Sequence, residues 1–176
     1  MKNMGKIFES QFKKSVPDYC LLIRLPDPPQ SFTQRSDTRF SVKNPCDFVM
    51  FDTKSKILFA LELKTTKYKS MSFDKLDDEN SSNSKMIHKH QILGLLNFSE
   101  YENVVAGFIF NFRDEDNNIE RTYFQNITKF MEMYNNIDKK SFNEIDLLLN
   151  GAVKIDSIKK RVNYVYDIEK FLNSQL

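Results

Sequence analysis

The feature that most constrains the fold is an almost unbroken run of apolar residues between positions 104 and 112. A strand with one face in water alternates apolar and polar residues, whereas a continuous apolar run is typical of a strand buried on both faces. Such a strand must be covered on each side by other elements. We therefore expect residues 104–112 to form an interior strand of a sheet with helices packed against it.

Shorter patterns along the chain indicate the elements around that strand. A polar turn over 52–56 joins two apolar runs and predicts a β-hairpin. The other expected elements are helices over 5–15, 86–98, 127–134 and 142–149, strands over 19–25, 46–51, 57–63 and 121–124, and a short strand or helix over 164–172. This order predicts a mixed α/β fold in a single domain over 1–176, with a central mixed β-sheet flanked by helices.

Composition excludes several classes of protein. The 40% apolar and 28% charged content of the 176 residues is that of a folded chain and not of a disordered one. No apolar run in the sequence approaches the roughly 18–20 residues that span a bilayer. The first six residues lack the apolar stretch of a signal peptide, so we expect a cytoplasmic protein with no membrane partner. Cys20 and Cys46 fit no zinc spacing and are expected to stay reduced.

Charge is distributed unevenly along the chain. Residues 1–69 carry 13 Lys/Arg and 7 Asp/Glu, a local charge of +6, and residues 70–176 carry −4. A basic half attracts phosphate backbones, although a solvated surface explains the same excess. Three prolines at 26, 28 and 29 open a polar and basic loop that runs to Pro45. Loops of this length without structure of their own are usually functional or mobile.

The most informative residues lie on the expected hairpin. Asp47 opens its first strand, and Glu62 and Lys64 are two residues apart on its second strand. Residues two apart on a strand leave the same face of the sheet, so these two side chains lie together. Two carboxylates and the Leu63 carbonyl are oxygen ligands of the kind that Mg²⁺ prefers, and Lys64 is a candidate to orient a water or stabilise negative charge. The alternative is that Glu62 and Lys64 form the polar face of an edge strand paired with Asp47.

This arrangement resembles the PD-(D/E)XK nuclease superfamily. Its core is a helix, a strand, a hairpin that bears D and ExK, and then a helix followed by a strand. Here the first motif position reads Asn44-Pro45-Cys46-Asp47, so the proline lies two residues before the Asp and not directly before it. The departure leaves the ligand itself unchanged.

A narrower resemblance links the chain to the RecU-type Holliday junction resolvases. The segments that carry it are Glu62-Leu63-Lys64-Thr65-Thr66-Lys67, Ser72-Phe73 and His88-Lys89-His90-Gln91-Ile92, with further echoes at Lys140-Ser141-Phe142, Asn150-Gly151 and 167–172. They match an ExKxTK signature, a Ser-Phe loop and an H-x-H-Q-I helix start in the same order. Residues 26–45 stand where RecU proteins carry a stalk that enters the junction, but this loop cannot be matched residue by residue.

The resemblance implies roles for individual residues. Asp47 and Glu62 would be metal ligands together with the Leu63 carbonyl, and Lys64 would be the catalytic lysine. Glu9 matches a carboxylate that many members place near the metal, and Gln91 would support the site from the following helix. The alternatives are a surface glutamate on an amphipathic helix and an ordinary helix-surface glutamine.

Other polar residues are candidates for binding DNA. His88 and His90 are two apart on an expected helix and should point to different sides, so a helix cap or a DNA contact is favoured over zinc. Lys and hydroxyl side chains after the ExK strand commonly contact phosphates, although solvated loop residues are the alternative. The candidate DNA-binding residues are Lys13, Lys14, Arg35, Arg39, Lys43, Thr65, Thr66, Lys67, Lys69 and His88.

Taken together, these resemblances imply a Mg²⁺-dependent, structure-selective DNA endonuclease, with Mn²⁺ as an alternative ion. A RecU-like resolvase in recombination and repair would cut branched or four-way DNA, and we expect a homodimer because resolving a junction needs two symmetric cuts. The alternatives are a restriction- or repair-type nuclease with another DNA target and a non-catalytic DNA-binding or regulatory module of the same fold. Intact Asp47, Glu62 and Lys64 argue against the last of these.

Overall fold

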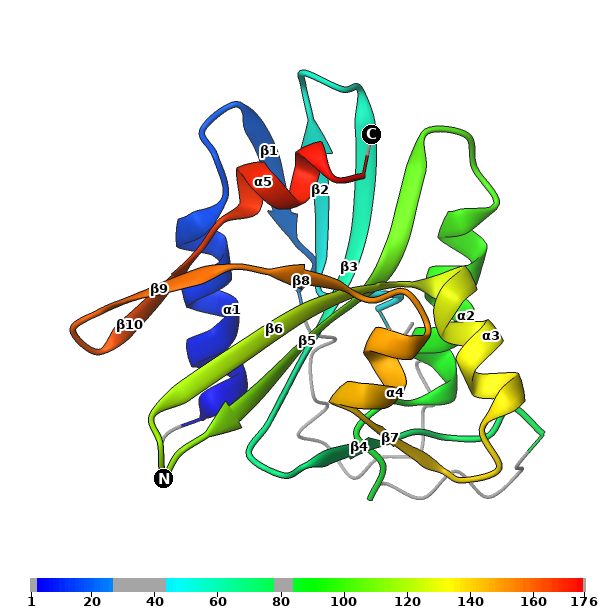
Figure 1. Cartoon of the computed structure of the whole chain (residues 1–176). Helices are drawn as coiled ribbons and strands as arrows, with labels where there is room; N and C mark the ends of the chain where they lie inside the picture. The colour runs from blue at the N-terminus through cyan, green and yellow to red at the C-terminus, as the bar shows by residue number, and fades with distance from the viewer. Residues whose placement is uncertain (1–2, 27–43, 78–83, 176) are drawn as a thin grey trace, which may run out of the picture.

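A computed structural model describes residues 3–26, 44–77 and 84–175 of the chain, and its elements are labelled in Figure 1. The helices are α1 (Met4–Ser15), α2 (Lys89–Ser99), α3 (Ile127–Asn136), α4 (Glu144–Leu149) and α5 (Ile168–Asn173). The strands are β1 (Cys20–Arg24), β2 (Phe48–Asp52), β3 (Ile57–Thr66), β4 (Ser70–Ser72), β5 (Val104–Asp114), β6 (Ile119–Asn126), β7 (Ser141–Asn143), β8 (Val153–Ile155), β9 (Ser157–Lys160) and β10 (Asn163–Tyr166).

Six of these strands form a mixed sheet in the order β1-β2-β3-β5-β6-β8. β2 and β3 are the antiparallel hairpin that the turn over 52–56 predicts, with Phe48 opposite Leu61 and Asp52 opposite Ile57. β3 and β5 run parallel, and the crossover between them contains α2. Parallel neighbours need such a long connection, whereas a hairpin needs only a short turn. The predicted mixed α/β class is therefore confirmed.

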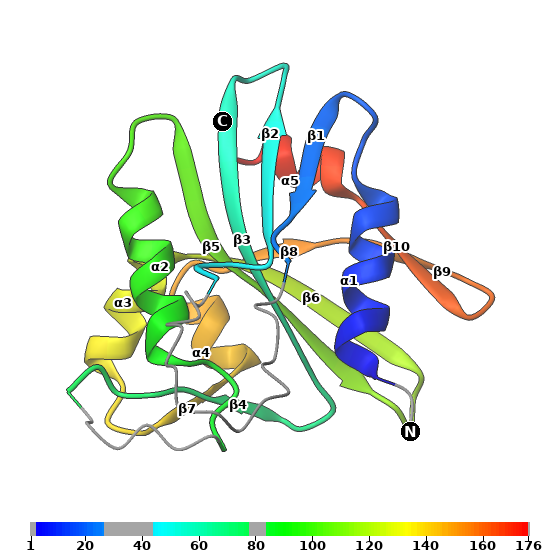
Figure 2. The ribbon, with the colours of Figure 1, turned by 180° about the vertical axis from the view of Figure 1, so that it is seen from behind.

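Helices cover both faces of the sheet, as the apolar run of β5 requires. On one face Phe108 and Phe110 of β5 pack with residues of α2, α3 and α4, including Ile92 and Phe130. On the other face Ile109 packs in a second cluster with residues of α1, α5 and β10. Figure 1 shows α1 and α5 on one side of the molecule and α2, α3 and α4 on the other, and Figure 2 gives the reverse view. The prediction of a strand buried on both faces is confirmed.

Several predicted elements differ from the structure in their bounds. The helix expected over 142–149 begins at Glu144, because residues 141–143 pair with β4 as strand β7. The polar composition of residues 67–85 predicts a mobile loop. This segment contains β4 and the buried Met71 and Phe73, while residues 78–83 lie outside the described part. The segment 164–172 contains the end of a strand and most of a helix, and β8 and β9 have no counterpart in the prediction.

Helix ends follow ordinary capping rules. Gly151 follows α4 with a φ of 76°, in the left-handed region where glycine costs least, as the sequence predicts for a helix C-terminus. None of the helices in the described residues is long and apolar enough to cross a membrane.

Phe130 on α3 tests how much the aromatic core contributes to stability. Its ring contacts those of Phe73, Phe108, Phe110 and Phe142, and the residue is fully buried. We expect Phe130→Ala to lower the free energy of unfolding by about 3–5 kcal/mol, because it leaves a cavity between the sheet and α3. Urea unfolding followed by circular dichroism measures the change.

Leu149→Ala is the matched control, because Leu149 is 80% exposed at the end of α4. It should change the free energy of unfolding by less than about 0.5 kcal/mol. Equal losses in the two variants would contradict the position of the aromatic cluster.

Candidate active site

The hairpin brings the predicted carboxylates together. Asp47 immediately precedes β2, and its amide donates a hydrogen bond to the Leu61 carbonyl at 3.1 Å. Asp47 Oδ2 accepts a hydrogen bond from the Leu63 amide at 2.8 Å, which places its carboxylate beside the Glu62–Lys64 segment. Lys64 Nζ lies 2.9 Å from Glu62 Oε1. The sequence spacing predicted this meeting, because a tight hairpin sets Asp47 opposite residues 61–63.

Glu62 lies deep inside the fold. β3 is flanked by β2 and β5, and only 3% of Glu62 is exposed. The alternative that Glu62 and Lys64 form the polar face of an edge strand is therefore wrong. β3 also continues to Thr66, so the charged pair lies within the strand and not at its end. A carboxylate in such a position is costly unless it is paired or holds a cation.

Burial controls the protonation of both carboxylates. Burial raises the pKa of Glu62 to about 7, and Asp47 adds to the rise while Lys64 opposes it. Burial also raises the pKa of Asp47, against the effect of the Leu63 amide and Lys64. Two neighbouring carboxylates with raised pKa values are typical of a site that binds a cation or transfers a proton.

Helix α2 supports Glu62 from the side. Gln91 Nε2 donates a hydrogen bond to Glu62 Oε1, so Gln91 is not an ordinary helix-surface glutamine. The other end of the same amide, Oε1, accepts the His88 amide at 2.9 Å at the start of the helix. Buried Asp74 accepts the Lys89 amide at 3.1 Å. The beginning of α2 is thus held at two points, and Gln91 is held with it.

Gly94 allows α2 to approach the hairpin closely. A Cβ atom at this position would stand 2.7 Å from Pro45 Cα and 2.8 Å from the Pro45 carbonyl oxygen. Real Cβ atoms do not come this close to backbone, so only glycine fits. Sequence reasoning missed both Gly94 and Asp74. An isolated glycine inside a helical pattern was the available signal for Gly94.

The two histidines are arranged differently from the prediction. His88 is the N-cap of α2 and does not lie within the helix. Its extended backbone lets its ring stack on that of His90, with centroids 5.7 Å apart and an interplanar angle of 10°. His88 Nδ1 lies 3.3 Å from Asp74 Oδ2. The expectation that the rings point to different sides was wrong, because it assumed that both residues are helical. The expected helix cap is confirmed.

Glu9 lies on α1 beside Arg24 of β1, with Glu9 Oε2 and Arg24 Nε 2.8 Å apart. The Glu9 charge raises the pKa values of both Asp47 and Glu62, although it is not the largest cause for either group. Glu9 is therefore near the carboxylate pair, and its alternative as a plain surface glutamate is disfavoured. Beside it Lys6, Ser10, Lys13, Arg24 and Phe48 line a small cavity of about 340 Å³, of which the sequence predicted only Glu9 and Lys13.

The four candidate phosphate-binding residues that follow Lys64 differ in their exposure to solvent. Thr65 and Thr66 lie within β3, and their hydroxyls are used inside the protein. The Thr65 hydroxyl donates to Asn111 Oδ1 at 2.7 Å, and Thr66 Oγ1 accepts the Tyr68 amide at 3.0 Å. Thr66 is also buried, so the alternative of a solvated loop residue is wrong for Thr66. Lys67 and Lys69 are exposed.

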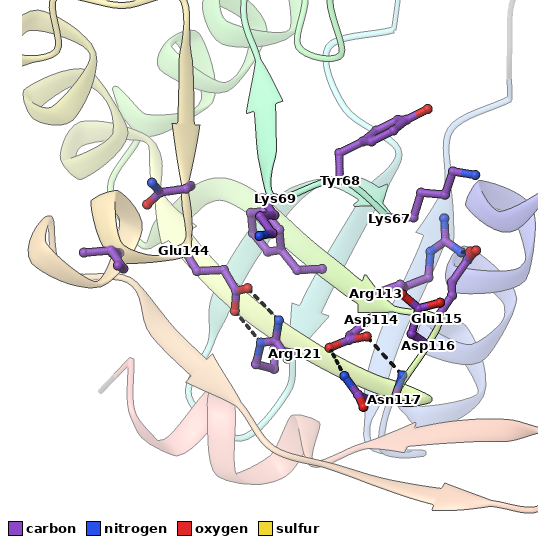
Figure 3. A pocket seen from close by; sticks show the side chains of 13 residues that line it. Lys67, Tyr68, Lys69, Arg113, Asp114, Glu115, Asp116, Asn117, Arg121 and Glu144 are labelled. Carbon is purple, nitrogen blue, oxygen red and sulfur yellow. Dashed lines mark hydrogen bonds and ion pairs between the residues drawn. The ribbon is translucent and has the colours of Figure 1, made fainter.

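Lys67 and Lys69 line a cavity of about 710 Å³ at the far end of β3, shown in Figure 3. Arg121 and Glu144 are paired at its wall by hydrogen bonds of 2.7 and 2.8 Å, and Asp114 accepts two hydrogen bonds from Asn117. The cavity is therefore mixed in charge, and most of its carboxylates are already engaged. Neither Asp47 nor Glu62 lines it, so it is separate from the carboxylate pair.

The remaining predicted residues divide into two groups. Lys13 and Lys14 are exposed on the last turn of α1. Arg35, Arg39 and Lys43 lie outside the described residues.

The donor atoms at the hairpin fit a hard divalent cation. Among residues 3–26, 44–77 and 84–175, no group of three or more His, Cys, Asp or Glu side chains is arranged to hold a metal. Two carboxylates are nevertheless adjacent, and Asp47 Oδ1 and Glu62 Oε2 receive no hydrogen bond from a described residue. Mg²⁺ commonly uses one or two carboxylates and fills its other positions with water and substrate oxygens.

Comparison with known proteins identifies a relative. No protein-family model matches the chain. The SPbeta prophage-derived uncharacterized protein YotM of Bacillus subtilis (strain 168) is 32% identical over 180 residues, which cover 96% of this chain and 84% of that protein. The chain belongs to the YotM family.

One solved structure is similar in fold to the YotM-family chain. It is that of Hjc from Archaeoglobus fulgidus, a Holliday junction resolvase from an archaeal hyperthermophile. The TM-score is 0.48 and the sequence identity is 13%, over 85% of this chain and 93% of the Hjc chain.

The raised pKa of Glu62 predicts how the stability of this YotM-family chain depends on pH. Because the folded pKa of about 7 exceeds the ordinary value of 4.5, the folded state holds a proton that the unfolded chain has released between those values. Stability from this group is therefore present at low pH and is lost as pH rises from about 4.5 to about 7. Glu62→Gln should remove the loss. The difference in unfolding free energy, variant minus wild type, should grow by on the order of 3 kcal/mol between acidic and alkaline pH.

Urea unfolding at several pH values, with a chelator present, measures this difference. Glu132→Gln is the control, because the Glu132 side chain is 52% exposed on α3. A difference between Glu62→Gln and wild type that stays flat with pH would contradict the burial of an ionisable Glu62.

Gly94→Ala tests the approach of α2. Alanine in place of glycine inside a helix normally stabilises by about 1 kcal/mol. Here the new methyl group would collide with Pro45, so we expect a loss of about 1–3 kcal/mol in unfolding free energy. Asn97→Ala, at an exposed position of the same helix, should leave stability unchanged or raise it. Gly94→Ala as stable as wild type would show that α2 does not lie this close to Pro45.

Proposed function

We propose that this chain is a divalent-cation-dependent endonuclease that hydrolyses phosphodiester bonds in DNA. The observation that carries the proposal is the meeting of Asp47 and Glu62 at the hairpin, with Lys64 Nζ 2.9 Å from Glu62. Glu62 is buried and Asp47 is half-buried, and among the described residues almost every buried side-chain polar atom has a hydrogen-bond partner. A cation bound between the two carboxylates would offset the cost of placing them there.

Each residue has a distinct part in the proposed reaction. Asp47, Glu62 and the Leu63 carbonyl would hold Mg²⁺ or Mn²⁺, which supplies Lewis-acid polarisation of the scissile phosphate. Lys64 is mostly buried beside Glu62, where its charge would stabilise the negative charge that grows on the phosphate as a water oxygen attacks phosphorus. The attacking water forms a new P–O bond and releases a proton to the surrounding solvent. The bond from phosphorus to the sugar oxygen breaks, and that oxygen takes up a proton from solvent.

Gln91 is proposed as a positioning residue. Its amide binds Glu62 Oε1 together with Lys64, which leaves Glu62 Oε2 as the oxygen to bind a cation. Hydrogen-bonded partners of metal ligands typically contribute about 10- to 100-fold to metal affinity or activity. The proposed role of Glu9 is similar in kind, because its charge acts on the pair from α1.

Within this activity we propose branched or four-way DNA as the preferred substrate and a homodimer as the active form. The three RecU-like segments support this, because they converge in space. Ser72 accepts the Ile87 amide at 3.0 Å, Asp74 binds the start of α2, and α2 brings Gln91 to Glu62. The proposed DNA contacts around the site are Lys67 and Lys69 after β3, Lys13 and Lys14 on α1, and Arg35, Arg39 and Lys43 outside the described residues.

Asp47→Asn and Glu62→Gln test the proposal. Each should lower the cleavage rate by more than about 100-fold, because each removes an ionic metal ligand and not merely a partner of one. DNA binding in the presence of a chelator should persist, because neither change removes a phosphate-binding cation. Labelled four-way junctions, linear duplexes and single strands are incubated with Mg²⁺ and analysed by gel electrophoresis, and Glu132→Gln serves as the active control.

The outcomes separate the alternatives. Faster cutting of junctions than of duplexes supports the resolvase, whereas equal cutting leaves a restriction- or repair-type nuclease. DNA binding without cleavage by the wild type would indicate a non-catalytic module. Cleavage by both variants at the wild-type rate would contradict the assignment of Asp47 and Glu62 as metal ligands of the active site.

A further inference from the structure

A two-stranded hairpin projects from the body of the molecule beside α1. β9 and β10 form a sheet of their own, separate from the six-stranded sheet, with Lys160 opposite Asn163. Figure 1 shows this hairpin in orange, extending past the rest of the ribbon on the side away from α3. Its base is fixed, because the Tyr166 amide donates to Ser15 Oγ of α1 at 3.0 Å and Tyr166 is buried.

The turn of this hairpin has an unusual sequence. Its two turn residues are Arg161 and Val162, and Arg161 has a φ of 56°. Two-residue hairpin turns favour Gly, Asn or Asp at positive φ, because a larger side chain is strained there. Val162 is 81% exposed and Ile158 on β9 is 70% exposed, so the strain is not offset by burial of these side chains. A residue in a strained backbone conformation that gains no compensating burial is expected mainly at functional sites.

Charge at the tip is also unbalanced. Lys159, Lys160 and Arg161 follow one another, and within the described residues none of them forms an ion pair with an acid. Nearby Lys154 and Lys170 differ, because both pair with Asp156. Adjacent cations without acidic partners repel one another and gain most from contact with a polyanion.

The hairpin packs against α1, which is also rich in basic residues. α1 and residues 157–166 together contain six Lys/Arg and one Asp/Glu, a charge of +5, whereas the whole chain carries +2 and the rest of it therefore −3. α1 presents Glu9 toward the carboxylate pair, and its Gln11 and Ser15 contact the hairpin. The cations at the tip thus lie on the far side of the helix that borders the site.

We propose that the β9–β10 hairpin is a second DNA-binding element that contacts the phosphate backbone of the duplex flanking the cleavage site. This inference rests on the proposed nuclease function and extends it to a part of the chain far from the D…ExK residues in sequence. Consecutive Lys and Arg side chains on a projecting ribbon suit phosphate contacts that position a duplex without reading its sequence. The partner is therefore duplex DNA of any sequence.

A double variant removes positive charge from the β9–β10 hairpin without disturbing its fold. Lys160→Gln with Arg161→Asn removes two charges, and Asn tolerates the left-handed conformation better than Arg, so the fold should be as stable as wild type or more stable. Binding to a labelled linear duplex is measured by fluorescence anisotropy over a salt series with a chelator present. We expect weaker binding, and a plot of log affinity against log salt whose slope is shallower by about 0.9 for each phosphate that the variant no longer binds.

The control is Lys129→Gln with Lys139→Gln, which removes the same net charge from α3 and from the segment before β7. It should leave the salt slope unchanged. Lys159→Gln with Lys160→Gln, which leaves the turn residues intact, repeats the test should Arg161→Asn impair folding.

Equal slopes for the hairpin variants and the wild type would overturn this inference, and so would equal reductions of affinity in the hairpin variants and the control. If cleavage still depends on Asp47 and Glu62 in that case, the proposed nuclease function stands and only the hairpin's role fails. Absence of duplex binding by the wild type would overturn the hairpin's role, and cleavage of four-way junctions by the wild type but not by Asp47→Asn or Glu62→Gln would then still support the proposed nuclease function.

Discussion

Placement of the Glu62 carboxylate on an interior strand is the constraint on which the rest of the site depends. β3 lies between β2 and β5, so water reaches Glu62 poorly and its ionised form is stabilised only by what surrounds it. Lys64 comes from the same strand, and Gln91 comes from the crossover helix that joins β3 to β5. Asp47 adds a second negative charge next to it. The arrangement costs folding energy, and a cation bound between the carboxylates would recover it.

The aromatic core maintains this costly arrangement. Two clusters of buried side chains, one on each face of the sheet, hold the helices that approach the hairpin. α2 is packed by Ile92 and Leu95 on one side of the strand, and Gly94 lets it approach Pro45. α1 is packed by Phe8 and Phe12 on the other. Each helix therefore contributes a polar side chain to the site from a rigid position, which is how a fold holds catalytic geometry.

The same helix α1 links the site to the basic hairpin. Its apolar face packs on the sheet, Glu9 lies near the carboxylates, and Ser15 binds the base of β10. The proposed nuclease function would need a chemical centre and a surface that holds a long polyanion across it. In this chain the two are built from different kinds of residue. The carboxylate pair joins the buried Glu62 to the half-buried Asp47, whereas α1 and the β9–β10 hairpin carry exposed basic residues.

The sequence by itself determined those features that depend on residues close together along the chain. The apolar run over 104–112 predicts an interior strand, the turn over 52–56 predicts the hairpin, and hairpin geometry then sets Asp47 beside Glu62 and Lys64. Tertiary structure alone decided what depends on contacts between distant segments. Glu62 lies on an interior strand because β5 pairs with β3, and the rings of His88 and His90 stack because α2 begins at Lys89, whose amide Asp74 binds. β9 escaped prediction because it is short and mostly exposed, so its side chains lack the periodic burial that reveals a strand in sequence.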